Sequence, residues 1–140
     1  MNKIVSDVNV LVSATFWSGE AYRILNMVDE HKISNIVSHE IMADYVEACN
    51  DEELMEKIER RKLTPSRTVE KITSMSMLIY PKKKFEIVKD DPDDDKIIEA
   101  AVEGAADYIV TYDNHLLKFK EFKGIKIVTP SNFLDLMGRD

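Results

Sequence analysis

The chain has 140 residues, enough for one domain with its own core, and 44% of them are hydrophobic. Its net charge of −7 argues against binding a phosphate backbone, unless cations held by the chain's own carboxylates reverse the local field. No apolar run reaches the roughly 18 residues of a membrane span, the residues before Ile4 do not have the pattern of a signal peptide, so none is expected, and the single cysteine, Cys49, excludes an internal disulfide. We therefore expect a cytoplasmic protein without membrane association.

Short apolar runs and helical periodicities alternate along the first half of the chain. They predict, in order, a strand at 4–6, an amphipathic helix at 19–30, a strand at 36–37, a helix capped by Ser38 and a polar helix at 51–62. Pro65 suits the first turn of a further helix, because its fixed φ is helical and no N–H is needed there. The apolar positions of that helix continue to Met75 and then to Met77 or Leu78.

The second half of the chain shows the same alternation. The predicted elements are a strand at 85–88, a helix opened by Asp91-Pro92, strands at 108–111 and 125–128, and a last helix that starts at Thr129-Pro130. Gly104 would end its helix as a left-handed residue. Buried strands that alternate with helices indicate the α/β class, with one domain spanning 1–140 and a parallel sheet of about five strands covered on both faces.

Acidic side chains follow three of the five predicted strands. Asp7 follows the first strand, the acidic run 90–95 follows the strand at 85–88, and Asp113 comes just beyond Thr111. Ligands of an open parallel sheet bind beyond the carboxyl ends of its strands. Carboxylates gathered there without a cation would repel one another, whereas Mg²⁺ prefers oxygen ligands. This pattern predicts a site for a divalent metal ion.

Two of the acidic positions require a choice between neighbours. Asp44 lies toward the apolar side of its helix, whereas Glu40 is freer to face solvent, so we prefer Asp44 as the site residue. In the run 90–95, the residues from 91 to 94 suit the cap and first turn of a helix. Asp95 lies on the buried stripe of that helix, but Asp94 has a similar relation to it, and periodicity does not separate the two.

Several motifs occur together and in a fixed order. They are residues 7–13 (DVNVLVS), Val37-Ser38 with an acid at 44, residues 91–96 (DPDDDK), residues 107–113 (DYIVTYD) and residues 128–134 (VTPSNFL). This set covers nearly the whole chain and resembles PIN-domain proteins of the toxin-like nuclease group. The resemblance implies a three-layer α/β/α sandwich around a parallel sheet. It also implies a metal-dependent ribonuclease, often the toxin of a toxin–antitoxin pair.

The resemblance also implies which residues form the site. Position by position, the four family acids fall on Asp7, Asp44, Asp95 and Asp113, so that Asp95 is chosen over Asp94. They would hold Mg²⁺ or Mn²⁺, which would activate a water to cut RNA. Residues expected to support the metal ligands or the substrate are Asn9, Thr111 and Ser131. The implied partners are an RNA substrate, an antitoxin protein and a second copy of the chain in a homodimer.

Three positions depart from the family pattern. Val8 stands where the family usually has Thr, Asp44 where it usually has Glu, and His115 where a second Asp often follows the fourth acid. These departures leave open an RNA-binding or interaction module with weak catalysis. A Mg²⁺-dependent phosphatase also carries an acid after its first strand, but such sites usually need Asp-x-Asp, and position 9 is Asn.

Overall fold

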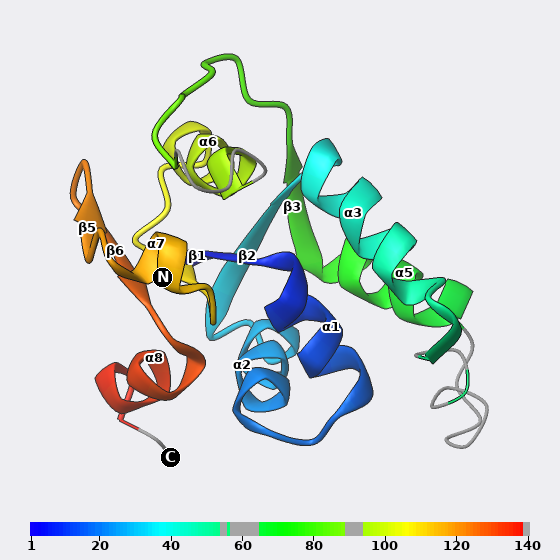
Figure 1. Cartoon of the computed structure of the whole chain (residues 1–140). Helices are drawn as coiled ribbons and strands as arrows, with labels where there is room; N and C mark the ends of the chain where they lie inside the picture. The colour runs from blue at the N-terminus through cyan, green and yellow to red at the C-terminus, as the bar shows by residue number, and fades with distance from the viewer. Residues whose placement is uncertain (54–55, 57–64, 89–93, 139–140) are drawn as a thin grey trace.

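The computed structural model of the protein describes residues 1–53, 56, 65–88 and 94–138 (Figure 1). The strands are β1 (Asn2–Ser6), β2 (Ile33–Ser38), β3 (Ser76–Ile79), β4 (Tyr108–Val110), β5 (Glu121–Phe122) and β6 (Ile125–Val128). The helices are α1 (Val8–Phe16), α2 (Glu20–Asp29), α3 (His39–Cys49), α5 (Pro65–Met75), α6 (Asp95–Glu103), α7 (Asn114–Leu117) and α8 (Pro130–Leu136). Most of the predicted helix at 51–62 and the predicted start at Asp91-Pro92 lie outside the described residues. None of the described helices has the length and apolar character to cross a membrane.

The strands form one sheet in the order β3-β2-β1-β4-β6-β5, in which only the β5–β6 pair is antiparallel. In register, Val5 of β1 lies between Ile36 of β2 and Ile109 of β4. Along the chain, β2 pairs with one side of β1 and β3 pairs with β2, whereas β4 pairs with the other side of β1. The direction of winding therefore changes between β1 and β4, where open α/β sheets bind their ligands.

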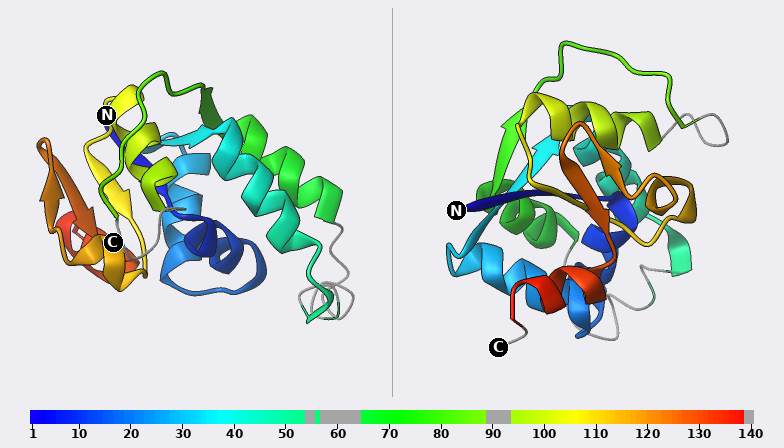
Figure 2. Two further views of the ribbon diagram at one scale, coloured as in Figure 1. Left: turned by 45° about the horizontal axis from the view of Figure 1, so that its top comes forward. Right: turned by 90° about the vertical axis from the view of Figure 1, so that its left-hand side faces the viewer.

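Helices cover both faces of this sheet (Figures 1 and 2). Because successive strand residues point to opposite faces, Ile4 and Val5 belong to different clusters of buried side chains. The cluster around Ile4 includes side chains of α2 and α8, and the cluster around Val5 includes side chains of α3 and α6. The predicted three-layer α/β/α arrangement with a mostly parallel sheet is confirmed.

The third strand is not where the sequence pattern placed it. β3 follows α5 directly and pairs with β2, so that Met77 and Leu78 lie on an edge strand and not on the helix. They are 46% and 45% exposed, as expected for side chains at the edge of a sheet. The predicted strand at 85–88 is wrong, since these residues pair with no strand and instead run beside α6.

Gly104 ends α6, but its backbone is right-handed, with φ of −82°. The left-handed residue is Ala105, with φ of 53°. The expectation of a left-handed Gly104 is therefore wrong, and glycine is needed there for another reason. A Cβ atom on Gly104 would lie 2.6 Å from Cδ1 and 2.9 Å from Cγ2 of Ile36, so glycine lets the end of α6 pack against β2.

Candidate metal centre

Asp7 is held at the junction of β1 and β4. It caps the N-terminus of α1, and its Oδ1 accepts a hydrogen bond from the amide of Val8 at 2.7 Å. Its own amide donates to the carbonyl of Val110 at 3.0 Å, which continues the β1–β4 pairing by one residue. The Oδ2 of Asp7 accepts from the hydroxyl of Thr111 at 2.7 Å. Asp7 is only 8% exposed, so these contacts fix a carboxylate at the carboxyl end of the sheet.

Thr111 joins Asp7 to Asp113. The fully buried Thr111 hydroxyl donates to Asp7 and accepts a hydrogen bond from the amide of Asp113 at 2.9 Å. Asp113 caps α7, where its Oδ1 accepts from the amide of His115 at 2.8 Å. A single hydroxyl therefore connects two of the predicted acids, and the supporting role expected of Thr111 stays a prediction.

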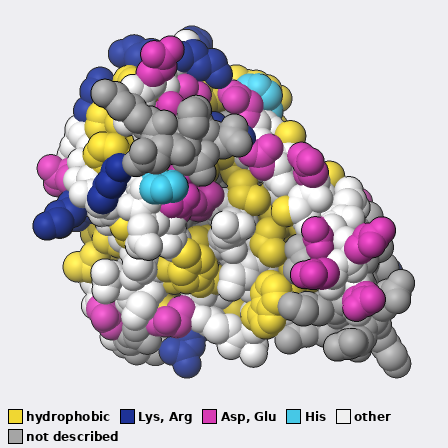
Figure 3. Space-filling model, in the orientation of Figure 1, with side chains coloured by type: hydrophobic (Ala, Val, Ile, Leu, Met, Phe, Trp, Pro, Cys, Tyr) yellow, Lys and Arg dark blue, Asp and Glu magenta, His cyan; other side chains and the backbone are white. Residues whose placement is uncertain are grey.

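Asp113 lies in a group with Asp94 and His115. One ligand atom from each of these three residues lies within 4.8 Å of the other two. Asp94 is the residue just before α6, and His115 is in the single turn of α7. No other group of this kind occurs within the described ranges. Carboxylate oxygens and an imidazole nitrogen are suitable ligands for a divalent cation, and the donor set fits Mn²⁺ well. Figure 3 shows that His and acidic side chains lie side by side on one face of the molecule.

The electrostatics of this group favour a cation. Burial raises the pKa of Asp113. A hydrogen bond with Asp94, a hydrogen bond from the amide of His115 and the charge of His115 lower this pKa and together outweigh burial, so the pKa of Asp113 lies below its ordinary value. Two carboxylates in hydrogen-bond contact must share a proton or have a positive charge between them. A metal ion at this position would remove the repulsion between Asp94 and Asp113.

Asp95, which the resemblance favoured over Asp94, has other partners. Its Oδ1 accepts from the amides of Ile87 and Val88 at 3.0 and 2.9 Å. The structure thus gives Asp94 and Asp95 separate environments, with Asp94 near Asp113 and Asp95 bound to the backbone that precedes it in the chain. On this geometry Asp94 is the better candidate for a metal ligand.

Asp95 is the first of three acids on α6 that bind backbone amides in the same way. We call Asp95, Glu99 and Glu103 the α6 acidic row, since residues four apart lie on one helical face. Glu99 accepts from the amide of Phe85 at 3.0 Å, and Glu103 accepts from the amide of Lys82 at 3.2 Å. These carboxylates provide the acceptors that a neighbouring strand would otherwise supply, which explains why the apolar run 85–88 is not part of the sheet.

Sequence reasoning missed Glu99, which is 5% exposed. Its regular spacing from Asp95 and Glu103 was the available signal, together with its place next to the buried Ile98. It also missed His115 as a possible ligand, although His115 stands where the family often has a further acid.

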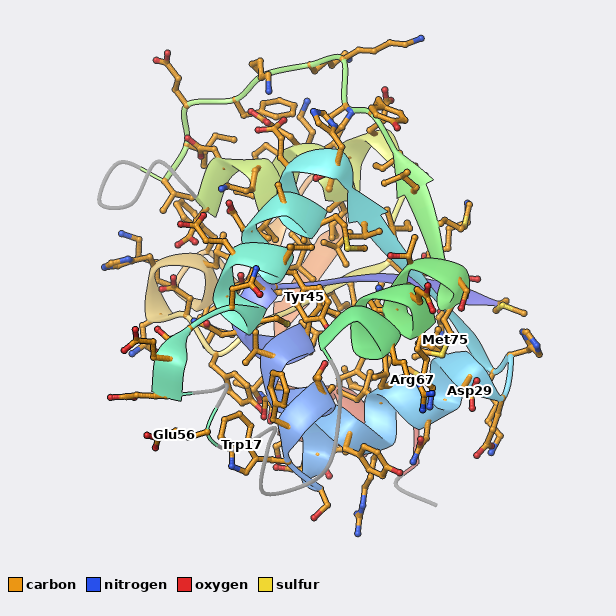
Figure 4. The ribbon with its side chains drawn as sticks, turned by 90° about the vertical axis from the view of Figure 1, so that its right-hand side faces the viewer. Trp17, Asp29, Tyr45, Glu56, Arg67 and Met75 are labelled. Atoms are coloured by element: carbon orange, nitrogen blue, oxygen red, sulfur yellow. The ribbon has the colours of Figure 1, made fainter. Side chains whose placement is uncertain are left out.

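Asp44 contacts Lys96, and the structure does not bring it into the group of Asp94. Tyr45, the next residue, is fully buried and shares a hydrogen bond with the hydroxyl of Thr15 on α1 at 2.8 Å (Figure 4). This contact fixes the rotation of α3 and leaves Asp44 at its half-exposed border, where Oδ2 meets Nζ of Lys96 from α6. Glu40, the rejected alternative, lies one turn earlier and binds Lys84 at 3.0 Å.

The remaining predicted residues lie near the same edge of the sheet. Asn9 is exposed in the first turn of α1, directly after Asp7 and Val8. Ser131 is half-buried in the first turn of α8, which begins where β6 ends. The amide of Thr111 donates to the carbonyl of Val128 at 2.9 Å, so the start of α8 is adjacent to the end of β4.

A doubly wound sheet with carboxylates where its winding changes direction defines an α/β protein with a candidate metal centre. A family model described as the PIN domain matches residues 3–115. The match spans most of the chain, which therefore belongs to the PIN domain family, as its motifs predicted. Proteins of this family are generally nucleases and typically use divalent metals. A comparison with curated proteins found no match.

Proposed function

We propose that the protein is a divalent-metal-dependent endoribonuclease and the toxin of a toxin–antitoxin pair. The observation that supports it most is the group of Asp94, Asp113 and His115, which Thr111 connects to Asp7. In this proposal Asp94 takes the place that sequence analysis gave to Asp95. Asn9 and Ser131 remain proposed contacts to the substrate.

The chain's own residues prepare the site for hydrolysis. When bound, Mg²⁺ or Mn²⁺ would lower the pKa of a water molecule and stabilise negative charge on the scissile phosphate. Thr111 binds the carboxylate of Asp7 and the backbone amide of Asp113, so little reorganisation of these two residues is needed when phosphate binds. The amide of His115 orients Asp113, and the burial of Asp7 and Asp94 limits competition from water.

The proposed partners follow from this activity. RNA is the substrate, an antitoxin protein covers the acidic site, and a second copy of the chain forms a homodimer in the cytoplasm. The family supports RNA as a partner, since its members are generally nucleases.

A second candidate function is an RNA-binding or interaction module with weak catalysis. The contact between Asp44 and Lys96 favours it, because one of the four predicted acids already has a cation of the chain as its partner. Titration with Mn²⁺ separates the two functions, since a module that has lost its metal would show no heat of binding.

The test of the proposal is cleavage of single-stranded RNA by the purified protein with Mn²⁺, with Mg²⁺ and with EDTA. We expect cleavage with either metal and none with EDTA. Asp113→Asn should reduce the rate by at least about 100-fold, because a direct ligand matters at least as much as the groups that orient it. Cleavage that persists in EDTA, or undiminished activity of Asp7→Asn, would contradict the proposal.

A further inference from the structure

Two aromatic side chains are stacked where β2 and β3 end. Ser38 and Ile79 are the last residues of these parallel strands and are partners in register. The next residues, His39 and Tyr80, therefore leave the sheet side by side. Their ring centroids are 5.0 Å apart, and the ring planes are inclined by only 25°. Tyr80 is nevertheless 63% exposed, more than any other tyrosine of the chain, so most of its ring is open to a ligand.

Three lysines come directly after this stack. Residues 82–84 belong to the segment that leaves the end of β3 and passes over α6 (Figure 1), and all three are exposed. Lys84 binds Glu40 and Glu99. The side chains of Lys82 and Lys83 form no ion pair with any residue that the structure describes. In a chain with a net charge of −7, this surface thus offers two cations to a ligand.

The acids beside these lysines have partners within the chain. Glu99, whose side chain is only 6% exposed, binds the amide of Phe85 as well as Lys84. Glu103 accepts a hydrogen bond from the backbone amide of Lys82, which leaves the ammonium of that lysine to other partners. The exposed positive charge next to the stack therefore comes from residues 82 and 83.

An exposed aromatic ring with lysines next to it suits single-stranded nucleic acid. Unpaired bases stack on aromatic faces, and basic side chains beside the ring bind the backbone phosphates. Protein interfaces are also rich in tyrosine, but they are poor in lysine. The lysines therefore favour a polyanion over a protein partner. A double helix is a poorer ligand than a single strand, because its bases are already stacked on one another.

We propose that Tyr80 and His39 form a stacking subsite for an unpaired base of RNA. Lys82 and Lys83 bind the phosphates next to that base. This inference rests on the proposed ribonuclease function and specifies its substrate as single-stranded. The subsite is at the same end of the sheet as Asp7, because the strands β1, β2 and β3 are parallel and Asp7 follows β1 as His39 follows β2.

Binding of a fluorescently labelled single-stranded RNA, followed by anisotropy, tests the stack. Ca²⁺ replaces Mn²⁺ in this experiment, because it takes oxygen ligands but activates water less. Tyr80→Leu should weaken binding by about 5-fold or more, and Tyr80→Phe should bind nearly as the wild type does, since a phenyl ring still stacks. Tyr22→Leu is the matched control. It removes a tyrosine of α2 that is 44% exposed and should leave the affinity unchanged.

The salt dependence of the same binding tests the lysines. Each phosphate contact that is lost should reduce the slope of log Kd against log salt concentration by about 0.7 for a single strand. Lys82→Gln and Lys83→Gln should each show this reduction. Lys126→Gln removes an exposed lysine of β6 and should leave the slope as it is in the wild type. Equal slopes in all of these proteins would contradict the role of the lysines.

The results separate this subsite from the proposed function. Wild-type affinity in Tyr80→Leu, or an equal loss in Tyr22→Leu, would overturn the subsite. If RNA binds through Tyr80 but is not cleaved in Mn²⁺, the proposed ribonuclease is contradicted and the subsite is not. Cleavage in Mn²⁺ without any effect of Tyr80→Leu on affinity contradicts the subsite alone. No binding of single-stranded RNA by the wild type contradicts both.

Discussion

At the scale of single residues, the start of α6 shows how neighbours acquire different tasks. Asp94 lies with Asp113 and His115, Asp95 accepts two backbone amides, and Lys96 contacts Asp44. Consecutive residues of a helix point about 100° apart, so each of the three meets a different part of the fold. The sequence predicted that one acid of this run faces metal. The choice between Asp94 and Asp95 depends on the path of residues 87 and 88 beside α6, and this path cannot be predicted from the local sequence pattern.

The different tasks of Asp94 and Asp95 lead to a direct prediction. Asp94→Asn should weaken Mn²⁺ binding by at least about 10-fold, because it removes a charge from the metal group. Asp95→Asn should leave the affinity nearly unchanged, since an amide oxygen can still accept the hydrogen bonds of Ile87 and Val88. Calorimetry with both variants measures the difference. If Asp95→Asn lost affinity and Asp94→Asn kept it, the original assignment of Asp95 would be restored.

Thr111 gives a second prediction at this scale. Thr111→Val keeps the shape but removes the hydroxyl that links Asp7 to Asp113. It should lower metal affinity by about 10–100-fold and destabilise the fold by about 1–3 kcal/mol.

Thr129→Val is the control for Thr111→Val. Thr129 caps α8 by accepting from the amide of Asn132 at 3.1 Å and takes no part in the hydrogen bonds by which Thr111 links Asp7 to Asp113. Thr129→Val should lower the free energy of unfolding by about 1 kcal/mol without a change in metal binding. Equal loss of metal affinity in both variants would show that Thr111 acts only through stability.

At the scale of helices and strands, the elements that could be predicted are those whose own side-chain pattern shows which residues are buried and where the element begins. The stripes of α2 and α3 and the buried runs of β1, β4 and β6 were predicted, as was the cap of α3 at Ser38. α1 was not, because five of its nine residues are buried and an apolar helix of this kind shows no stripe. The run 85–88 has the composition of a strand, but it pairs with no described strand and its amides bond to the α6 acidic row.

Each acid of the α6 acidic row should contribute more to the free energy of unfolding the more deeply its carboxylate is buried. Glu99→Ala leaves the amide of Phe85 without its acceptor in a nearly buried place, and should cost about 1–3 kcal/mol. Glu99→Gln keeps an acceptor and should cost less. Glu103→Ala is the exposed counterpart, because water can replace its bond to Lys82, and we expect a change within about 0.5 kcal/mol. Urea unfolding measures all three, and equal costs for Glu99→Ala and Glu103→Ala would contradict this role.

At the scale of the whole molecule, the order of the strands creates the site. β1 and β4 are neighbours although about a hundred residues separate Asp7 from Asp113 along the chain. The alternation of strands and helices predicted that acids would meet at one edge of a parallel sheet, and the family motifs predicted their order. The contact of Asp44 with Lys96 could not be predicted from the sequence, since it depends on the orientation of α3, in which Tyr45 bonds to Thr15 of α1.

The acidic balance of the molecule also bears on how it meets RNA. The net charge is −7, and Lys84 of the basic run at 82–84 is bound to Glu40 and Glu99. Attraction between the surface as a whole and a phosphate backbone is therefore weak. A metal ion at Asp94 and Asp113 would supply the local positive charge, so RNA binding as well as cleavage should depend on the metal.

The most direct measurement of the central claim is the chemistry of the RNA ends after cleavage in Mn²⁺ by the wild type and by Asp113→Asn. Attack by a metal-activated water predicts products with a 5′-phosphate and a 3′-hydroxyl, formed by the wild type and nearly absent from the variant. Products that end in a 2′,3′-cyclic phosphate, formed equally by both proteins, would show that the group of Asp94, Asp113 and His115 does not carry out the reaction.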